Sequence, residues 1–225
     1  PCPSPRSPAP PPEPVPPGLL PEDLRLLASP GTELPIVQRV PGGSNVLRRV
    51  SRELRASDDA GRLEHRMRAT LLSSKGVGLA APQIGIGARA ILVMHGVRPV
   101  TPGGPTEPHV EWYVNPRIVE RSDEITLDYE GCLSIAEVCG LVRRHRRVVV
   151  EHGVAGAPRR HVEVTGFDAR IFQHEIDHLD GVLYVDRVEG GLQPKERLKE
   201  LRDQLRRDHP QEVAALRGAA MTAVL

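Results

Sequence analysis

Four features are scarce in this chain of 225 residues, and each scarcity argues against a class of protein. There are three cysteines, Cys2, Cys132 and Cys139, which are too few for a disulfide scaffold and indicate a reducing compartment. Aromatic residues make up 3%, which argues against a protein that stacks bases on aromatic rings. The 30 basic and 29 acidic side chains nearly cancel, which argues against a polyanion coat. No run approaches the ~20 apolar residues that span a bilayer, so we expect no membrane protein.

Proline, by contrast, is concentrated at one end of the chain. Ten of the 23 prolines lie in residues 1–17. Because proline fixes φ and lacks an N–H, we expect residues 1–34 to form a disordered, Pro-rich arm. A folded domain is expected over 35–190, with a C-terminal helix and tail over 191–225. The arm has neither the apolar run of a secretory signal nor the character of an organelle leader, which favours the bacterial cytoplasm.

Hydrophobic periodicity in the rest of the chain predicts both helices and strands. Leu63, Met67 and Leu71 recur at four-residue spacing after an acidic start at 57–59, which predicts a helix ended by Gly76. Strands in runs with a few helices indicate an α+β fold rather than a doubly wound sheet. The other expected elements are strands at 89–94, 111–114, 141–151 and 161–165, helices over 167–180 and from Pro194 to before Pro210, and a long loop at 96–110.

The segment QHEIDHLDG, residues 173–181, carries the strongest chemical signal. His174 and His178 are four apart, so on a helix they lie on one face, where two imidazoles can bind one metal ion. Glu175, next to the first histidine, can act on a metal-bound water as general base. Ile171 shares the same stripe, so we expect this face to point into the core.

A catalytic metal site needs a third protein ligand and one open position. Tyr184 stands where the metzincin pattern has its third histidine, which excludes that class. Two alternatives remain. One is Cys132, in the segment EGCLS, which would give a sulfur and nitrogen donor set suited to Fe²⁺, Co²⁺, Ni²⁺ or Zn²⁺. The other is a downstream glutamate, as in a zinc metallopeptidase, with the candidates Glu189, Glu196 and Glu200.

A third informative segment is GVGLAAPQIG, residues 76–85. Its small residues allow close approach of the backbone to a ligand. The amide of Gln83 can donate a hydrogen bond to a developing oxyanion. The segment lacks the lysine followed by serine or threonine of a P-loop, so it is not read as a phosphate site.

The three segments together resemble the peptide deformylase family. Its members carry GxGLAAxQ, EGCLS and QHExDHLxG in this order, which stand here at 76–83, 130–134 and 173–181. The resemblance covers about residues 35–190. It implies an α+β fold in which mixed or antiparallel β-sheets pack around a central metal-binding HExxH helix, with an N-terminal and a C-terminal helix. It also implies a hydrolase that removes the N-formyl group from the initiator methionine of newly synthesised polypeptides and releases formate.

The resemblance further implies the roles of individual residues. Cys132, His174 and His178 bind one divalent metal, with Fe²⁺ expected in the cell and Zn²⁺, Ni²⁺ or Co²⁺ in a purified sample. Glu175 is the general acid and base. Gln83 stabilises the oxyanion.

A second set of residues is implied to hold the substrate or its oxyanion. The backbone N–H of Leu133 assists Gln83. Val77 and Ile171 line the pocket for the methionine side chain, and Gly78 pairs its backbone with the peptide.

Two residues depart from the family pattern on the substrate side. Ala136 stands where proline is usual and Cys139 where arginine is frequent. We expect Cys139 to be a structural thiol rather than a second ligand.

The expected partners are N-formylmethionyl peptides, with neither DNA nor a membrane. The basic helix over 194–207 suggests transient contact with the ribosome. We expect the basic run 143–147 to be the partly paired outer face of a strand rather than an RNA site. A non-catalytic module that binds metal or nascent chains is an alternative from a different class.

Overall fold

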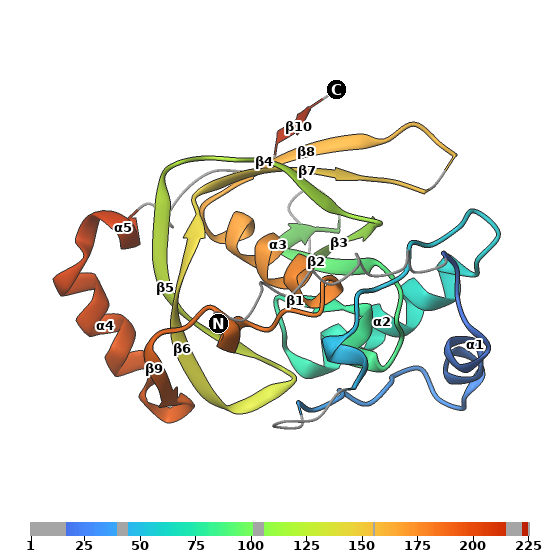
Figure 1. Cartoon of the computed structure of the whole chain (residues 1–225), viewed down its shortest axis with the longest axis horizontal. Helices are drawn as coiled ribbons and strands as arrows, with labels where there is room; N and C mark the ends of the chain where they lie inside the picture. The colour runs from blue at the N-terminus through green and yellow to red at the C-terminus, as the bar shows by residue number, and fades with distance from the viewer. Residues whose placement is uncertain (1–16, 40–44, 101–105, 155, 215–221, 225) are drawn as a thin grey trace, which may run out of the picture.

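The structure is a computed structural model, and it describes residues 17–39, 45–100, 106–154, 156–214 and 222–224. Figure 1 shows helix α3 at the centre, with sheets around it and the other helices at the periphery. The helices are α1 Pro21–Ala28, α2 Ala60–Ser74, α3 Gly166–Leu179, α4 Leu198–Asp208 and α5 Pro210–Ala214, with short 3₁₀ turns η1 Val46–Arg48, η2 Ala81–Ile84, η3 Tyr184–Asp186 and η4 Lys195–Arg197.

The described strands form three antiparallel sheets. Their orders are β1-β2-β3, β10-β8-β7-β4 and β5-β6-β9. The strands are β1 Gly78–Ala80, β2 Ala90–Pro99, β3 Thr106–Val114, β4 Arg117–Arg121, β5 Ile125–Cys132, β6 Ile135–His145, β7 Arg147–His152, β8 Arg160–Thr165, β9 Glu189–Pro194 and β10 Thr222–Val224. The α+β class expected from the sequence is therefore confirmed. The mixed sheets implied by the resemblance are not found in the described ranges, where one isolated bridge, Arg52 to Ala88, is parallel.

Helix α3 is buried because sheets contact it on several sides. It packs against β1 and β2 of one sheet and β4, β7 and β8 of another, and it also contacts β6. Val148, Val164, Ala169 and Phe172 belong to the apolar cluster around it, each 0% exposed. This packing holds the helix in place and so orients the side chains that it buries.

Helix α2 follows the sequence prediction closely. The side chain of Asp59 accepts a hydrogen bond from the backbone N–H of Arg62 at 3.0 Å and so caps the helix. Leu63, Met67 and Leu71 are fully buried against the β1-β2-β3 sheet. The sole tryptophan, Trp112 on β3, packs against the same cluster.

The stretch 96–110 is largely strand, so the expected long loop is wrong. β2 runs to Pro99, β3 begins at Thr106, and Pro108 pairs with Val97. Residues 101–105 lie outside the described part of the chain. Proline is tolerated here because β3 is the edge strand of its sheet as described, where a missing N–H can face away from the ladder.

The second half of the expected arm is folded. Residues 17–34 contain α1, and Leu27 and Leu34 are buried in the same cluster as α2. Pro21 occupies the first position of α1, where a helix has no need of that N–H. The expectation of a disordered arm is therefore wrong over 17–34, and residues 1–16 lie outside the described ranges.

The C-terminal boundary expected at residue 190 falls inside a strand. β9 pairs with β6 over residues 189–194, so the body of the fold continues past that point. α4 begins at Leu198 rather than near Pro194, because η4 comes between them. Leu201 and Leu205 are its buried residues. Among the described residues, no helix has the length and apolarity needed to cross a bilayer.

Candidate active site

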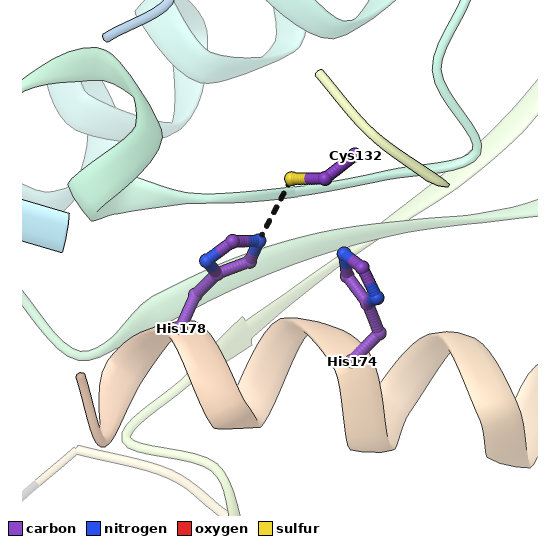
Figure 2. A group of neighbouring side chains, drawn as sticks. All are labelled: Cys132, His174 and His178. Atoms are coloured by element: carbon purple, nitrogen blue, oxygen red, sulfur yellow. Dashed lines mark hydrogen bonds between the residues drawn. The ribbon is translucent and has the colours of Figure 1, made fainter. Parts of the chain in front are cut away.

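Three potential metal ligands meet at one point. Cys132 ends β5, while His174 and His178 lie one turn apart on α3, and their ligand atoms all fall within 4.8 Å of one another. The Sγ of Cys132 lies 3.3 Å from Nε2 of His178. Figure 2 shows both imidazoles rising from the helix toward the thiol. The segment far upstream in sequence thus folds over the histidine pair.

The glutamates considered as alternative third ligands lie elsewhere. Glu189, Glu196 and Glu200 are exposed, and Glu189 and Glu200 are paired with Arg143 and Arg197. In the part of the chain that the structure describes, the cysteine–histidine group is the one cluster of donor side chains close enough to share an ion. The geometry therefore favours Cys132 over a glutamate.

His174 is oriented by a buried carboxylate. Its Nδ1 lies 2.9 Å from Oε2 of Glu130, which leaves Nε2 free to face the thiol. Glu130 also accepts hydrogen bonds from Arg144 at 3.0 and 2.9 Å and from Arg170 at 2.7 Å. Burial alone would raise the pKa of Glu130, but Arg144 and His174 hold that pKa well below its usual range. The ionised carboxylate can therefore fix the histidine ring.

This network revises the reading of the basic run 143–147. Arg143, Arg146 and Arg147 form ion pairs with glutamates at the surface, as the strand interpretation expected. Arg144 differs, because its side chain is 4% exposed and also donates to Asp177 at 2.5 Å. It is an internal support of the site rather than part of an outer face.

The local electrostatics favour the metal-binding form of the thiol. Burial would raise the pKa of Cys132, but the neighbouring rings of His178 and His174 hold the pKa well below its ordinary value. A thiolate is the form in which cysteine binds metals. Gln83 adds a donor, with its Nε2 3.4 Å from the same sulfur.

Glu175 is buried beside the three donors. It is 5% exposed, and its Oε2 has no hydrogen-bond partner among the described residues. Burial raises the pKa of Glu175 to about 7. A carboxyl group with such a pKa can both take up and release a proton near neutrality.

The loop 76–85 is shaped by the same residues that the sequence singled out. Oε1 of Gln83 accepts a hydrogen bond from the backbone N–H of Ala80 at 2.8 Å, which turns the amide N–H₂ toward Cys132. A Cβ added to Gly78 would lie 2.5 Å from Oε1 of Glu175. A larger residue at that point would therefore have to displace the carboxylate.

A cleft of about 380 Å³ opens onto these groups. Eight of the nine predicted site residues line it, and His178, 1% exposed, lies beneath. Ile171 is 5% exposed at the inner end, whereas Val77 is 46% exposed at the rim. The remaining lining residues are Lys75, Gly76, Tyr129, Glu130, Gly131, Phe167, Arg170, Lys195, Leu198 and Arg202.

The two departures from the family pattern lie outside this lining. Ala136 is exposed, and Cys139 is fully buried with its thiol 3.8 Å from the carbonyl oxygen of Pro194. The interpretation of Cys139 as a structural thiol agrees with this position. The sequence analysis did not predict that Arg170 and Glu130 support the site. The position of Glu130, one glycine before Cys132, was the available signal for its role.

Comparisons with known proteins agree with this geometry. The family model described as polypeptide deformylase matches residues 36–193. The peptide deformylase 2 of Gloeobacter violaceus is 40% identical over 151 residues, which are 67% of this chain and 78% of the relative. The peptide deformylase of Heliobacterium modesticaldum is 43% identical over 148 residues, 65% of this chain and 90% of the relative.

Solved structures show the same likeness in three dimensions. A Met-Ala-Ser-bound class I type b peptide deformylase from Acinetobacter baumannii is 36% identical, with a TM-score of 0.58 over 69% of this chain and 98% of that chain. The peptide deformylase of Thermotoga maritima is 33% identical, with a TM-score of 0.55 and the same coverage. The chain therefore belongs to the polypeptide deformylase family.

Proposed function

We propose that Cys132, His174 and His178 hold one divalent metal at which this deformylase acts. Its reaction is the removal of the N-formyl group from newly synthesised polypeptides. The observation that carries the assignment of the site is the approach of one thiol and two imidazoles within 4.8 Å, beside a buried carboxylate. One sulfur and two nitrogen donors suit Fe²⁺, Zn²⁺, Ni²⁺ or Co²⁺ and leave a coordination position open. Fe²⁺ is the metal we propose in the cell.

A metal held there would supply a water of lowered pKa and polarise the formyl carbonyl. The protein residues divide the remaining work. Glu175 takes the proton of the attacking water and later delivers a proton to the leaving amine, which its burial and raised pKa support. Gln83 Nε2 and the backbone N–H of Leu133 donate to the developing oxyanion. The position of the Gln83 amide, 3.4 Å from the ligand sulfur, supports this role.

The proposed binding site for the peptide lies at one edge of the β1-β2-β3 sheet. β1 is an edge strand of the β1-β2-β3 sheet as described, so Gly78 can pair its backbone with an extended peptide. Val77 and Ile171 both line the cleft and form the pocket for the methionine side chain. We also propose that the exposed basic face of α4 makes transient contact with the ribosome. A location in the bacterial cytoplasm stays a prediction.

Release of formate from formyl-Met-Ala-Ser tests the proposal. We expect Glu175→Gln to lower kcat by about 10²–10⁴-fold, because the amide cannot carry the proton. The same variant should keep about one metal per chain, measured by elemental analysis after purification under argon. Cys132→Ser should instead lose the metal.

Two results would contradict the assignment. If Cys132→Ser keeps both metal and activity, a metallopeptidase-type site with a glutamate ligand replaces the present one. If the wild-type protein binds metal and releases no formate, the chain is a binding module.

A further inference from the structure

The C-terminal segment forms part of the wall of the cleft. Lys195 of η4 and Leu198 and Arg202 of α4 line the cleft together with Tyr129 of β5. Arg202 anchors the helix there, since its Nε donates to Asp128 at 3.0 Å and its terminal nitrogen to the carbonyl of Tyr129 at 2.8 Å. Lys195, Leu198 and Arg202 lie beyond the segment 36–193 that matches the family model, so that match assigns these three residues no role.

Charge is distributed unevenly along the cleft. Of the described residues that line it, the two carboxylates, Glu130 and Glu175, are each 5% exposed and lie beside the metal ligands. Lys75 and Lys195 are exposed, and the side chain of Arg202 is 34% exposed. The open end of the cleft therefore presents cations from two separate parts of the chain, the end of α2 and the η4–α4 segment.

A bound peptide must pass this end. Its formyl group has to reach the buried donors, and the residues after the methionine then leave through the open part of the cleft. We propose that Lys75 and Lys195 form a subsite for anionic side chains in the peptide segment that follows the methionine. The inference rests on the proposed function, because it takes the path of the peptide from the position of the metal ligands.

The expected effect is a preference in kcat/KM. Each exposed ion pair changes an equilibrium by about 1.4- to 5-fold, so two lysines should favour an acidic peptide by about 2- to 25-fold at low salt. Because both lysines face water, the preference should fall as the ionic strength rises and the screening length shortens.

Three peptide amides test the subsite with the metal-loaded full-length enzyme. They are formyl-Met-Ala-Glu-Glu-amide, formyl-Met-Ala-Gln-Gln-amide and formyl-Met-Ala-Lys-Lys-amide, which differ only in the charge after the second residue. We expect kcat/KM to rank the acidic peptide first and the basic peptide last. The double variant K75Q/K195Q should bring the ratio of the acidic to the neutral peptide to about one.

Lys199, four residues after Lys195, provides a matched control. Lys199 is exposed on α4 and does not line the cleft, although it lines an adjoining groove that shares Lys195 and Arg202 with the cleft. K199Q should keep the wild-type ratio. Equal kcat/KM for all three peptides, or an unchanged ratio in K75Q/K195Q, would overturn the subsite while leaving the deformylase function intact. Failure of every peptide to release formate would instead overturn the proposed function.

Discussion

Gly78 and Glu175 are in closer contact than any larger residue would allow. The site for a Cβ at Gly78 is 2.5 Å from a carboxylate oxygen and 2.9 Å from the carboxylate carbon. Real Cβ atoms do not approach other atoms so closely, and Glu175 is buried, so a Cβ at residue 78 would have to displace the carboxylate within the site. The absence of a side chain at residue 78 therefore leaves room for the Glu175 carboxylate.

Gly78→Ala should displace the Glu175 carboxylate from the position in which we propose that it acts. We expect kcat/KM for formyl-Met-Ala-Ser to fall by about 10²-fold, since misplacement by about 1 Å has that order of effect. Steady-state formate release measures it.

Gly61→Ala is the control for this substitution. Gly61 lies in α2, and a Cβ there meets nothing within 4 Å. It should leave kcat/KM unchanged and raise the free energy of unfolding by about 0.5–1 kcal/mol, because alanine favours the helix. Wild-type activity in Gly78→Ala would show that the carboxylate has room to move.

At the residue scale, short motifs predicted which side chains lie together, because metal chemistry restricts both residue type and spacing. Helical spacing alone predicted that His174 and His178 lie on one face. The family resemblance then favoured Cys132 over a glutamate as the third ligand. Arg144 and Arg170 were not predicted, because a buried arginine has the same sequence appearance as an exposed one. Their burial depends on the fold of β5 and β6 over α3, which no local pattern encodes.

At the scale of elements, Arg144 joins the β5–β6 hairpin to the helix that carries the histidines. It lies on β6 and donates to Glu130 of β5 and to Asp177 of α3. Its removal would leave two buried carboxylates with fewer partners, and breaking such a pair costs about 3–5 kcal/mol. The hairpin carries Cys132, the proposed metal ligand, so stability and metal affinity should change together.

Arg144→Leu should therefore lower the free energy of unfolding by about 3–5 kcal/mol, measured by urea denaturation of the metal-loaded protein. Arg143→Leu provides a neighbouring control. Arg143 pairs with Glu189 at the surface, with its side chain 50% exposed, and its loss should cost at most about 1 kcal/mol. Equal losses in the two variants would mean that the buried network contributes little.

Periodicity predicted α2, α3 and β8 well, because each alternates or repeats against a core. The single strand expected over 141–151 is wrong, because the chain turns at Arg146 and divides it between β6 and β7, which lie in different sheets. Periodicity also failed over 96–110 and 17–34, where proline was taken as a sign of irregular structure. Pro108 lies in an edge strand and Pro21 at a helix start, the two settings in which the missing N–H breaks no hydrogen bond. Those settings are known only once neighbouring elements are placed.

At the scale of the whole molecule, His152 joins two sheets. It ends β7, and its ring lies edge-on to Tyr113 of β3 with centroids 5.0 Å apart. Burial lowers the pKa of His152, and the charge of Arg160 acts in the same direction. The neutral ring is therefore the form that the folded protein holds.

The sign of the pH effect follows from this lowered pKa. The unfolded chain binds a proton at His152 more readily, so its contribution favours unfolding as the pH falls below the ordinary histidine value of about 6.5. His152→Phe keeps a ring against Tyr113 and removes the titration. Between about pH 7 and 5, the free energy of unfolding should fall less in this variant than in the wild type, by urea denaturation. Identical slopes would contradict the assignment.

The fluorescence of Trp112 can report the unfolding of one part of the core. The chain has one tryptophan, and that indole packs on the cluster between α2 and the β1-β2-β3 sheet, whereas Cys132 belongs to a different cluster. Its emission therefore reports the loss of one cluster, while far-ultraviolet circular dichroism averages over all three sheets. Superimposable denaturation curves from the two signals would establish that the sheets unfold as a single cooperative unit.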